Sequence, residues 1–142
     1  MNMIKFIKLL LILSWLLLIF LTSHITFPPE DPNRIKLWYE YTYDKSMHLI
    51  LYGFLAYLIA SFLIENKKLK WQWIFWVAVL FCYFYGITDE WHQGFVAGRG
   101  VSYYDLCFNV IGGIGGASLY KIWRTDGSNR GWYAREMHGK TV

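Results

Sequence analysis

The stretch IKFIKLLLILSWLLLIFLT, residues 4–22, decides the class of this protein. Its only charges are Lys5 and Lys8, and everything after Lys8 is apolar or weakly polar. An α-helix rises about 1.5 Å per residue, so a helix of this length crosses about 30 Å of hydrocarbon. A cleaved signal peptide is the alternative. However, Leu21-Thr22-Ser23 lacks the small-x-small cleavage pattern, which favours a retained transmembrane helix.

The rest of the chain repeats this apolar pattern. The 142 residues are 56% hydrophobic and 20% aromatic, and the mean hydropathy of +0.26 is high for a protein in water. Three more apolar runs follow, at residues 47–64, 71–88 and 104–123. We therefore predict an all-α, polytopic membrane protein, a bundle of four transmembrane helices. It forms a single domain over residues 1–142, with a basic and poorly ordered tail at 124–142.

The charge distribution predicts the topology and excludes one class of partner. A net charge of +4 would suggest nucleic acid if the protein were soluble. The basic residues instead flank the apolar runs, with ten on the side of the N-terminus and four on the opposite side. Lys and Arg near the ends of transmembrane helices are enriched on the cytoplasmic side of the membrane. We therefore expect a multi-pass protein of the cell membrane with both termini cytoplasmic. Its partner is the lipid bilayer, and no nucleic acid is expected.

Neither the cysteines nor the general motifs indicate a cofactor. Cys82 and Cys107 lie inside apolar runs without metal-ligand spacing, so we interpret both as small buried hydrophobic residues. The sequence lacks H-E-x-x-H, G-x-S-x-G, a Walker lysine loop and a G-x-G-x-x-G motif after a strand. The cofactor is therefore unknown, and no metal site is predicted.

Three polar clusters interrupt the predicted spans, at residues 44–48, 89–93 and 99–105. The alternation of membrane crossings places all three at the outer face. Polar groups at this depth normally face a protein interior, which predicts one outward-facing polar site. Within these clusters, we interpret Asp89 and His92 as solvated loop residues.

On the second predicted helix, Asp44, His48 and Tyr52 are spaced i, i+4 and i+8, so they share one face. His48 lies about one turn below the membrane boundary, where an ionisable side chain needs polar neighbours. Alternatively, Asp44 is only the N-cap of the helix and Lys45 is only a snorkelling anchor.

On the fourth predicted helix, Asp105, Asn109, Gly112 and Gly116 follow one another along one face. The two glycines allow another helix to approach closely. The buried side of this helix therefore carries a carboxylate and an amide above a glycine contact. The alternative is that Asp105 caps the helix and Asn109 only ties helices together.

Glu90, Gln93 and Arg99 complete the candidate site. Glu90 and Gln93 share one side of the third helix, and Glu90 is the strongest candidate for a general base or a metal ligand. Arg99 lies between two glycines, where its guanidinium can bind a phosphate or carboxylate. Alternatively, Arg99 forms an ion pair with Glu90 or Asp105.

These residues form an ordered set with defined spacing. The set is Asp44-Lys45-x-x-His48-x-x-x-Tyr52, then Asp89-Glu90-x-x-Gln93, then Arg99-x-x-Ser102-x-x-Asp105-x-x-x-Asn109-x-x-Gly112. It resembles the VanZ-like family of small bacterial membrane proteins over about residues 44–116. One departure is Ala97, where the family often has a proline. The resemblance implies a four-helix membrane protein whose namesake gives low-level resistance to the glycopeptide teicoplanin.

Two functions follow from the polar pattern and the resemblance. In the first, a non-enzymatic envelope protein binds an anionic lipid or cell-wall precursor headgroup and so modulates teicoplanin susceptibility. Its ligand-binding residues are Arg99, Lys45, Asp44, Tyr52, Gln93, Ser102 and Asn109. In the second, a membrane-embedded hydrolase or transferase acts on a lipid-linked phosphate, with Glu90, His48 and Asp105 as catalytic residues and Arg99 as the oxyanion clamp. A third interpretation is a polar network that only stabilises the bundle.

Mutual pairing lowers the cost of placing ionised groups at membrane depth. We therefore expect one cluster with Arg99 at its centre, supplied by three helices and a loop. Its members are His48, Glu90, Gln93, Arg99, Asp105 and Asn109. If Arg99 is structural, Glu90 and Asp105 bind it; if it is a ligand site, it keeps donors free.

Overall fold

The structure, a computed structural model, describes residues 3–25, 38–97 and 99–138. It contains four helices, α1 (Met3–Ser23), α2 (Trp38–Leu63), α3 (Trp71–Gln93) and α4 (Tyr103–His138), and no strand among the described residues. This confirms the predicted all-α class. By length and composition, α1, α3 and the Thr42–Leu63 part of α2 can cross a membrane. The fourth predicted span lies in α4, which is less apolar because it contains glycines, Asn109 and Lys121.

Three helix ends differ from the prediction. Helix α2 starts at Trp38 rather than at residue 47, because the prolines of this link all precede Trp38 and nothing after it breaks the helix. Helix α3 continues beyond residue 88 to Gln93, since the first glycine that follows is Gly94. Helix α4 continues to His138, so the predicted poorly ordered tail is largely helical.

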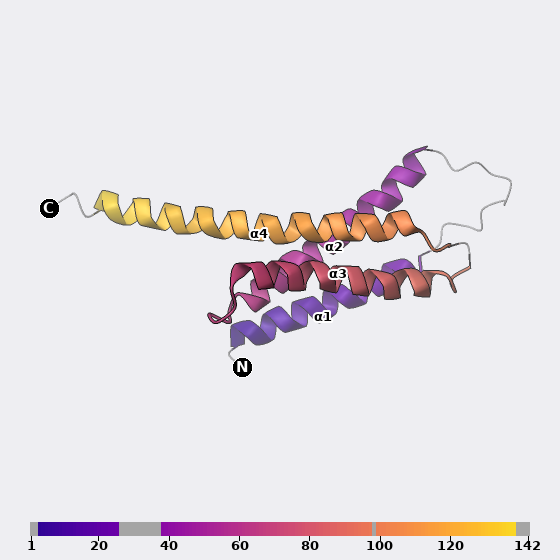
Figure 1. Cartoon of the computed structure of the whole chain (residues 1–142), viewed down its shortest axis with the longest axis horizontal. Coiled ribbons are helices and arrows are strands. Elements are labelled where there is room, and N and C mark those ends of the chain that lie inside the picture. Colours follow the sequence, from indigo (N-terminus) through magenta and orange to yellow (C-terminus); the bar gives the residue numbers. More distant parts are fainter. Residues whose placement is uncertain (1–2, 26–37, 98, 139–142) are drawn as a thin grey trace.

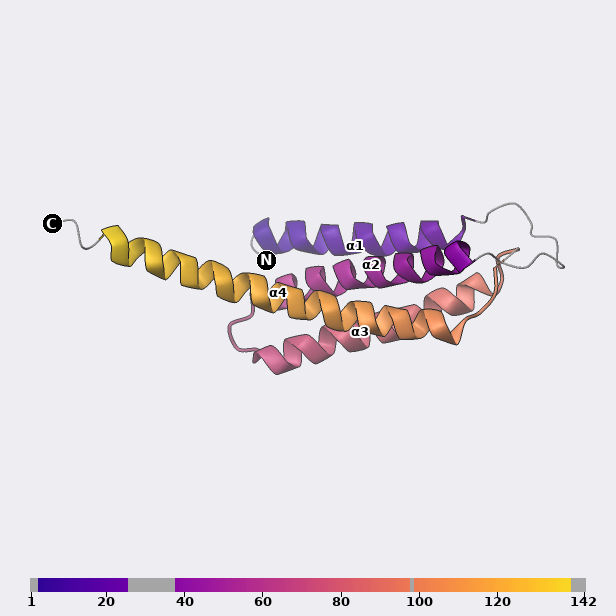
Figure 2. The same cartoon turned by 90° about the horizontal axis from the view of Figure 1, so that it is seen from above.

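The helices alternate in direction, so the bundle has two chemically different ends (Figure 1). We call one the polar end; there α1 and α3 finish and α2 and α4 begin. We call the other the basic end, with the turn at residues 64–70 and its three lysines between α2 and α3. Beyond the basic end, α4 projects past the other three helices in both views (Figures 1 and 2).

The closest helix contact joins α2 and α4, which share the most extensive interface. A Cβ atom on Gly112 would lie 2.4 Å from the carbonyl oxygen of Leu49, and one on Gly116 would lie 1.8 Å from that of Gly53. No side chain fits at either position, so the two backbones are in direct contact. The predicted glycine contact is confirmed, and it sets the position of α4 on α2.

Side chains of α1, α2, α3 and α4 form the apolar core, which includes Ile19, Tyr52, Leu55, Ala78 and Ala117. Two hydrogen bonds to backbone oxygens join the middle of helix α1 to its neighbours. Trp15 donates to Leu51 over 2.8 Å, and Tyr85 donates to Leu16 over 2.8 Å. Most large side chains of α1 are exposed outside these contacts, as expected for a helix surrounded by lipid.

The two cysteines have different surroundings. Cys82 is buried in the core, as predicted, and its thiol lies 3.5 Å from the carbonyl oxygen of Tyr52. Cys107 is exposed on α4, so its interpretation as a buried residue is wrong. The helical period explains the difference, because Cys107 lies two residues from Asp105 and Asn109 and therefore off the buried face.

At the basic end, Lys8 of α1 binds Ser61 in the last turn of α2 and Glu65 just after that helix. Its ammonium donates to Glu65 over 2.5 Å and to the carbonyl oxygen of Ser61 over 2.8 Å. This hydrogen bond lowers the pKa of the Glu65 carboxyl, and the charges of Lys8, Lys5 and Arg124 act in the same direction. The pair therefore holds the start of α1 to the end of α2.

Candidate functional site

Lys45 is the basic group at the centre of the polar end. Its side chain, 6% exposed, binds the carboxylates of Asp105 on α4 and Asp44 on α2, the latter over 3.1 Å. Its ammonium also lies 3.5 Å from the Ser102 hydroxyl. Two carboxylates thus neutralise this cation. Lys45 is a buried ion-pair partner rather than a snorkelling anchor, and Asp44 is an interior residue of α2 rather than its N-cap.

His48 and Asn109 extend this ion-pair group toward the middle of the bundle. The Nδ1 atom of His48 lies 2.9 Å from Oδ1 of Asn109, and its Nε2 atom lies 3.9 Å from a carboxylate oxygen of Asp105. Both side chains are buried. The expected shared face of His48 and Tyr52 is present, because their rings stack with centroids 6.3 Å apart. We call this set, Asp44, Lys45, His48, Ser102, Asp105 and Asn109, the lysine group.

The lysine group contains donors that could coordinate a divalent cation. One ligand atom from each of Asp44, His48 and Asp105 lies within 4.8 Å of the others. Lys45, however, binds both of these carboxylates. Its ammonium lies among these donors and offsets one of the two negative charges of the carboxylates.

Glu90 connects the lysine group to α3. One carboxylate oxygen accepts a hydrogen bond of 2.8 Å from the backbone N–H of Ser102, just before α4 begins. The other, Oε1, is buried and has no hydrogen-bond partner within the described residues, and the same holds for Nδ2 of Asn109. This Nδ2 atom lies against Gly86, one helical turn before Glu90. A buried acceptor and a buried donor, both unpaired, therefore belong to one α3–α4 contact.

Asp89 is the centre of a second group, which we call the Asp89 group and which consists of Ser23, Tyr52, Asp89, Gln93 and Arg99. It accepts hydrogen bonds from the hydroxyl of Ser23, from the hydroxyl of Tyr52 over 3.1 Å and from the amide of Gln93 over 3.3 Å. Asp89 is 6% exposed, so its interpretation as a solvated loop residue is wrong. Because α3 continues to Gln93, Asp89 and Gln93 lie one turn apart on one buried face. The i, i+4 spacing of Asp89 and Gln93 in the sequence could have indicated that they share this face. No sequence pattern near Ser23 indicated that it binds Asp89.

Arg99 belongs to this second group and not to the first. Its guanidinium donates to Oε1 of Gln93 over 3.2 Å and to the carbonyl oxygen of Ile25 over 3.2 Å. Neither acceptor is charged, and within the described part of the chain no carboxylate binds Arg99. The expectation that Arg99 is the centre of the cluster, paired with Glu90 or Asp105, is wrong. Lys45 takes that position because it lies on α2, directly opposite Asp105.

A hollow of about 320 Å³ lies beside Asp89, between the ends of α1 and α3. Its lining residues are Phe20, Tyr85, Thr88, Asp89, Trp91 and His92. The His92 ring lies 4.7 Å from that of Phe20 and 4.4 Å from that of His24, measured between centroids. We call this feature the α1–α3 hollow. Four of its six lining residues are aromatic, counting His92, and it is continuous with the Asp89 group through Asp89 itself.

The structure thus brings the predicted site residues to one end of the bundle, but in two adjacent groups. His48, Asp105 and Asn109 join Lys45, whereas Gln93 and Arg99 join Asp89. Glu90 links them because it follows Asp89 in sequence and binds Ser102 of the lysine group. In the first group, Lys45 is paired with two carboxylates. In the second, the acceptors that bind Arg99 within the described residues are neutral.

Comparison with known proteins identifies a family for this chain. The sequence profile of the VanZ/LLP1 family matches residues 6–124, which is most of the chain. No curated protein and no solved structure matches the chain. The match includes all of α2 and α3, most of α1, α4 up to residue 124 and every residue of the two polar groups.

Proposed function

The chain belongs to the VanZ/LLP1 family, and we propose that it binds an anionic headgroup at its polar end. The proposed ligand is a phosphate-bearing lipid or a lipid-linked cell-wall precursor in the outer leaflet of the cell membrane. Its occupancy would modulate susceptibility to teicoplanin. One observation carries the proposal: Arg99 is held by two neutral oxygens and is not neutralised by any carboxylate of the described chain.

The contrast between Lys45 and Arg99 supports a division of roles. Lys45 is buried against two carboxylates, so it has little attraction left for an external anion. Arg99 is half-buried at the rim, and among the described residues Gln93 and Ile25 each accept one N–H from a different terminal nitrogen. A planar guanidinium with free donors binds phosphate oxygens in a bidentate geometry. Arg99 is therefore the proposed anion-binding residue.

The α1–α3 hollow supports an amphiphilic ligand rather than a small anion. Gln93 accepts from Arg99 and donates to Asp89, which lines the hollow, so the cation and the aromatic walls are neighbours. An apolar chain attached to a phosphate group can lie along these walls while its headgroup contacts Arg99. The hollow also lies at the side of the bundle where α1 exposes its apolar side chains to lipid.

The link to teicoplanin comes from the family resemblance. If the polar end holds the headgroup of a wall precursor, it competes with a glycopeptide for access to that precursor. The positive-inside distribution, with the lysine turn at residues 64–70 at the basic end, favours an outward-facing polar end. An outward-facing site and an extracellular antibiotic would then meet on the same side of the membrane.

A binding titration tests this proposal. The probe is a polyprenyl diphosphate, added to the purified chain in lipid nanodiscs. Loss of a charged hydrogen-bonding partner costs about 1.5–3 kcal/mol, so Arg99→Gln should weaken binding by roughly 10- to 100-fold. Lys67→Gln, which removes a charge at the basic end, should leave the affinity unchanged. Expression of the wild-type chain should raise the teicoplanin tolerance of a susceptible host, and Arg99→Gln should abolish that effect. Equal affinity of Arg99→Gln and wild type would exclude Arg99 as the anion-binding residue.

Glu90 favours a second candidate function, hydrolysis or transfer of a lipid-linked phosphate. Its buried Oε1 atom has no partner among the described residues, which leaves it available as a general base. His48 and Asp105 would then act as an acid and an orienting carboxylate, and Arg99 would stabilise the phosphoryl oxygens. Glu90→Gln should lower phosphate release from the same probe by orders of magnitude, whereas Glu65→Gln at the basic end should not. Probe binding without any phosphate release from the wild-type chain would leave only the binding function.

A further inference from the structure

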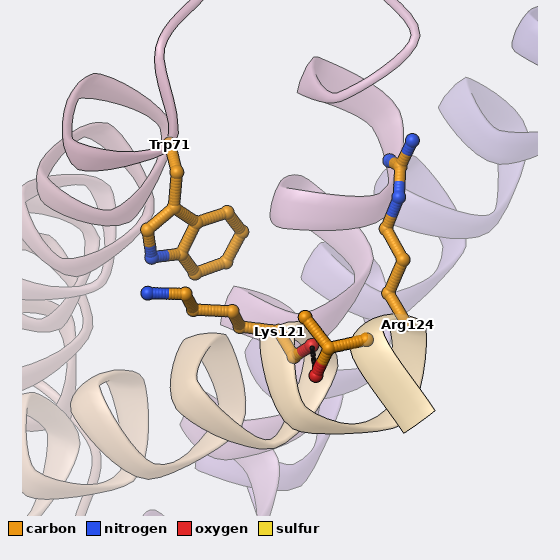
Figure 3. A pocket seen from close by; sticks show the side chains of 4 residues that line it. Trp71, Lys121 and Arg124 are labelled. Carbon is orange, nitrogen blue, oxygen red and sulfur yellow. Dashed lines mark hydrogen bonds between the residues drawn. The ribbon is translucent and has the colours of Figure 1, made fainter. Parts of the chain in front are cut away.

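A separate cationic pocket lies at the basic end, where α4 passes the start of α3 (Figure 3). The pocket has a volume of about 290 Å³ and is lined by Trp71, Lys121, Arg124 and Thr125. The ammonium of Lys121 lies 5.7 Å from the centroid of the Trp71 ring, and Figure 3 shows Arg124 on the other side of the opening. We propose that this pocket binds the phosphate headgroup of an anionic phospholipid.

The charges of the lining residues support an anionic ligand. Lys121 and Arg124 are three residues apart on α4, so they lie on the same side of that helix, and both are exposed. Among the residues whose side chains the structure describes, no carboxylate lines the pocket. Glu65 is close enough to feel the charge of Arg124, but its carboxylate is bound to Lys8 over 2.5 Å. Two cations therefore face the pocket, and no carboxylate among its described lining residues neutralises them.

The surroundings of the pocket support a lipid rather than a soluble phosphate. Leu119, Ile122 and Trp123 are each about three-fifths exposed on the adjoining turns of α4. The pocket thus combines basic side chains and an indole ring, and exposed apolar side chains lie on the adjoining turns of α4. This combination is typical of the boundary between headgroups and acyl chains, and basic pockets between transmembrane helices commonly hold lipid headgroups. The Thr125 hydroxyl bonds to backbone oxygens of α4, so the two cations provide the recognition.

Native mass spectrometry of the detergent-purified full chain tests the proposal. The probes are dioleoyl phosphatidylglycerol, dioleoyl phosphatidylcholine and inorganic phosphate, each added alone over the same concentration range. We expect phosphatidylglycerol to bind at least about 10-fold more tightly than phosphatidylcholine, given the usual attraction of two basic side chains for an anionic lipid. Lys121→Gln/Arg124→Gln should lower the affinity for phosphatidylglycerol by roughly 10- to 30-fold.

Two matched variants make the outcome specific. Lys121→Arg/Arg124→Lys keeps both charges and should retain binding. Lys67→Gln/Lys68→Gln removes two exposed charges from the same end without touching the pocket, and it should also retain binding. An equal loss in this control would mean general charge attraction and would overturn the proposal. Inorganic phosphate that binds as tightly as phosphatidylglycerol would show a site for free anions and would equally overturn it. Binding of the polyprenyl diphosphate at the polar end is independent of all these outcomes.

Discussion

Replacement of Gly116 by alanine should destabilise the bundle at its closest helix contact. A Cβ atom at this position would lie 1.8 Å from the carbonyl oxygen of Gly53 and 2.6 Å from its carbon. Ordinary contacts with a Cβ atom begin at 3.4 Å, so α2 and α4 must separate locally by about 1.6 Å, the difference between 3.4 and 1.8 Å. The obstructing atoms belong to the backbone, so no side-chain rotation can relieve the overlap.

The size of the effect follows from the packing that this separation disturbs. Overpacking a well-packed interior typically costs about 1–3 kcal/mol, and a backbone obstacle places this case near the upper value. The higher helix propensity of alanine offsets this destabilisation by at most about 1 kcal/mol. We therefore expect Gly116→Ala to lower the free energy of unfolding by about 2 kcal/mol or more.

Gly115→Ala is the matched control, because nothing lies within 4 Å of a Cβ atom there. Its free energy of unfolding should stay within about 1 kcal/mol of wild type. The measurement is reversible unfolding in bicelles, supported by thermal melting in detergent. If the two alanine variants are equally stable, the close α2–α4 contact is absent in the folded protein, and the position of the polar groups inferred from it is lost.

Three further predictions concern topology, pH and the Asp89 group. The first uses a background without Cys82 and Cys107, labelled in intact cells with a membrane-impermeant thiol reagent. Cysteines introduced at Asn66 and Ser128 should resist the reagent, whereas Val101→Cys should react. The reverse labelling pattern would invert the topology. Lys8 lowers the pKa of Glu65, so this pair stabilises the fold at neutral pH, and the stabilisation is lost as the pH falls through the lowered pKa. The difference in melting temperature between wild type and Glu65→Gln should therefore vanish in acid, and a constant difference would contradict the assigned ion pair. Tyr52→Phe removes a buried hydrogen bond to Asp89 and should cost about 1.5–3 kcal/mol in unfolding experiments, whereas Tyr104→Phe on the exposed surface should cost nothing measurable.

The sequence was most informative where a single local property decides the outcome. Apolar length identified all four helices, because only a helix satisfies its own backbone within a bilayer. Helical spacing identified the contact face of Gly112 and Gly116, and it placed His48 and Tyr52 on one stripe. The direction of each crossing then brought the three polar clusters to one end of the bundle.

The sequence was least informative where two distant elements compete for one partner. Arg99 was the expected ion-pair partner of Asp105, and only the packing of α2 on α4 shows that Lys45 takes this position. Similarly, Ser23 reaches Asp89 because α1 ends beside α3, and no local pattern reports that contact. Asp89 itself was misassigned because only Glu90 was paired with Gln93 on the helix surface, and the i, i+4 relation of Asp89 with Gln93 was not considered.

The division of roles between Lys45 and Arg99 makes the last prediction, in which stability and binding respond to different residues. Lys45→Met leaves the buried carboxylate of Asp105 without its ammonium partner and should cost about 3–5 kcal/mol of unfolding free energy. Adding Asp105→Leu removes the stranded charge, so the double variant should recover much of that stability. Arg99→Gln loses only partly exposed bonds to neutral acceptors, so it should cost less than about 1.5 kcal/mol while it weakens polyprenyl diphosphate binding. These free energies are measured by unfolding in bicelles, beside the binding titration on the same samples. A loss of stability in Arg99→Gln as large as that in Lys45→Met would make Arg99 a structural clamp, and the proposed ligand site would then have no uncompensated cation.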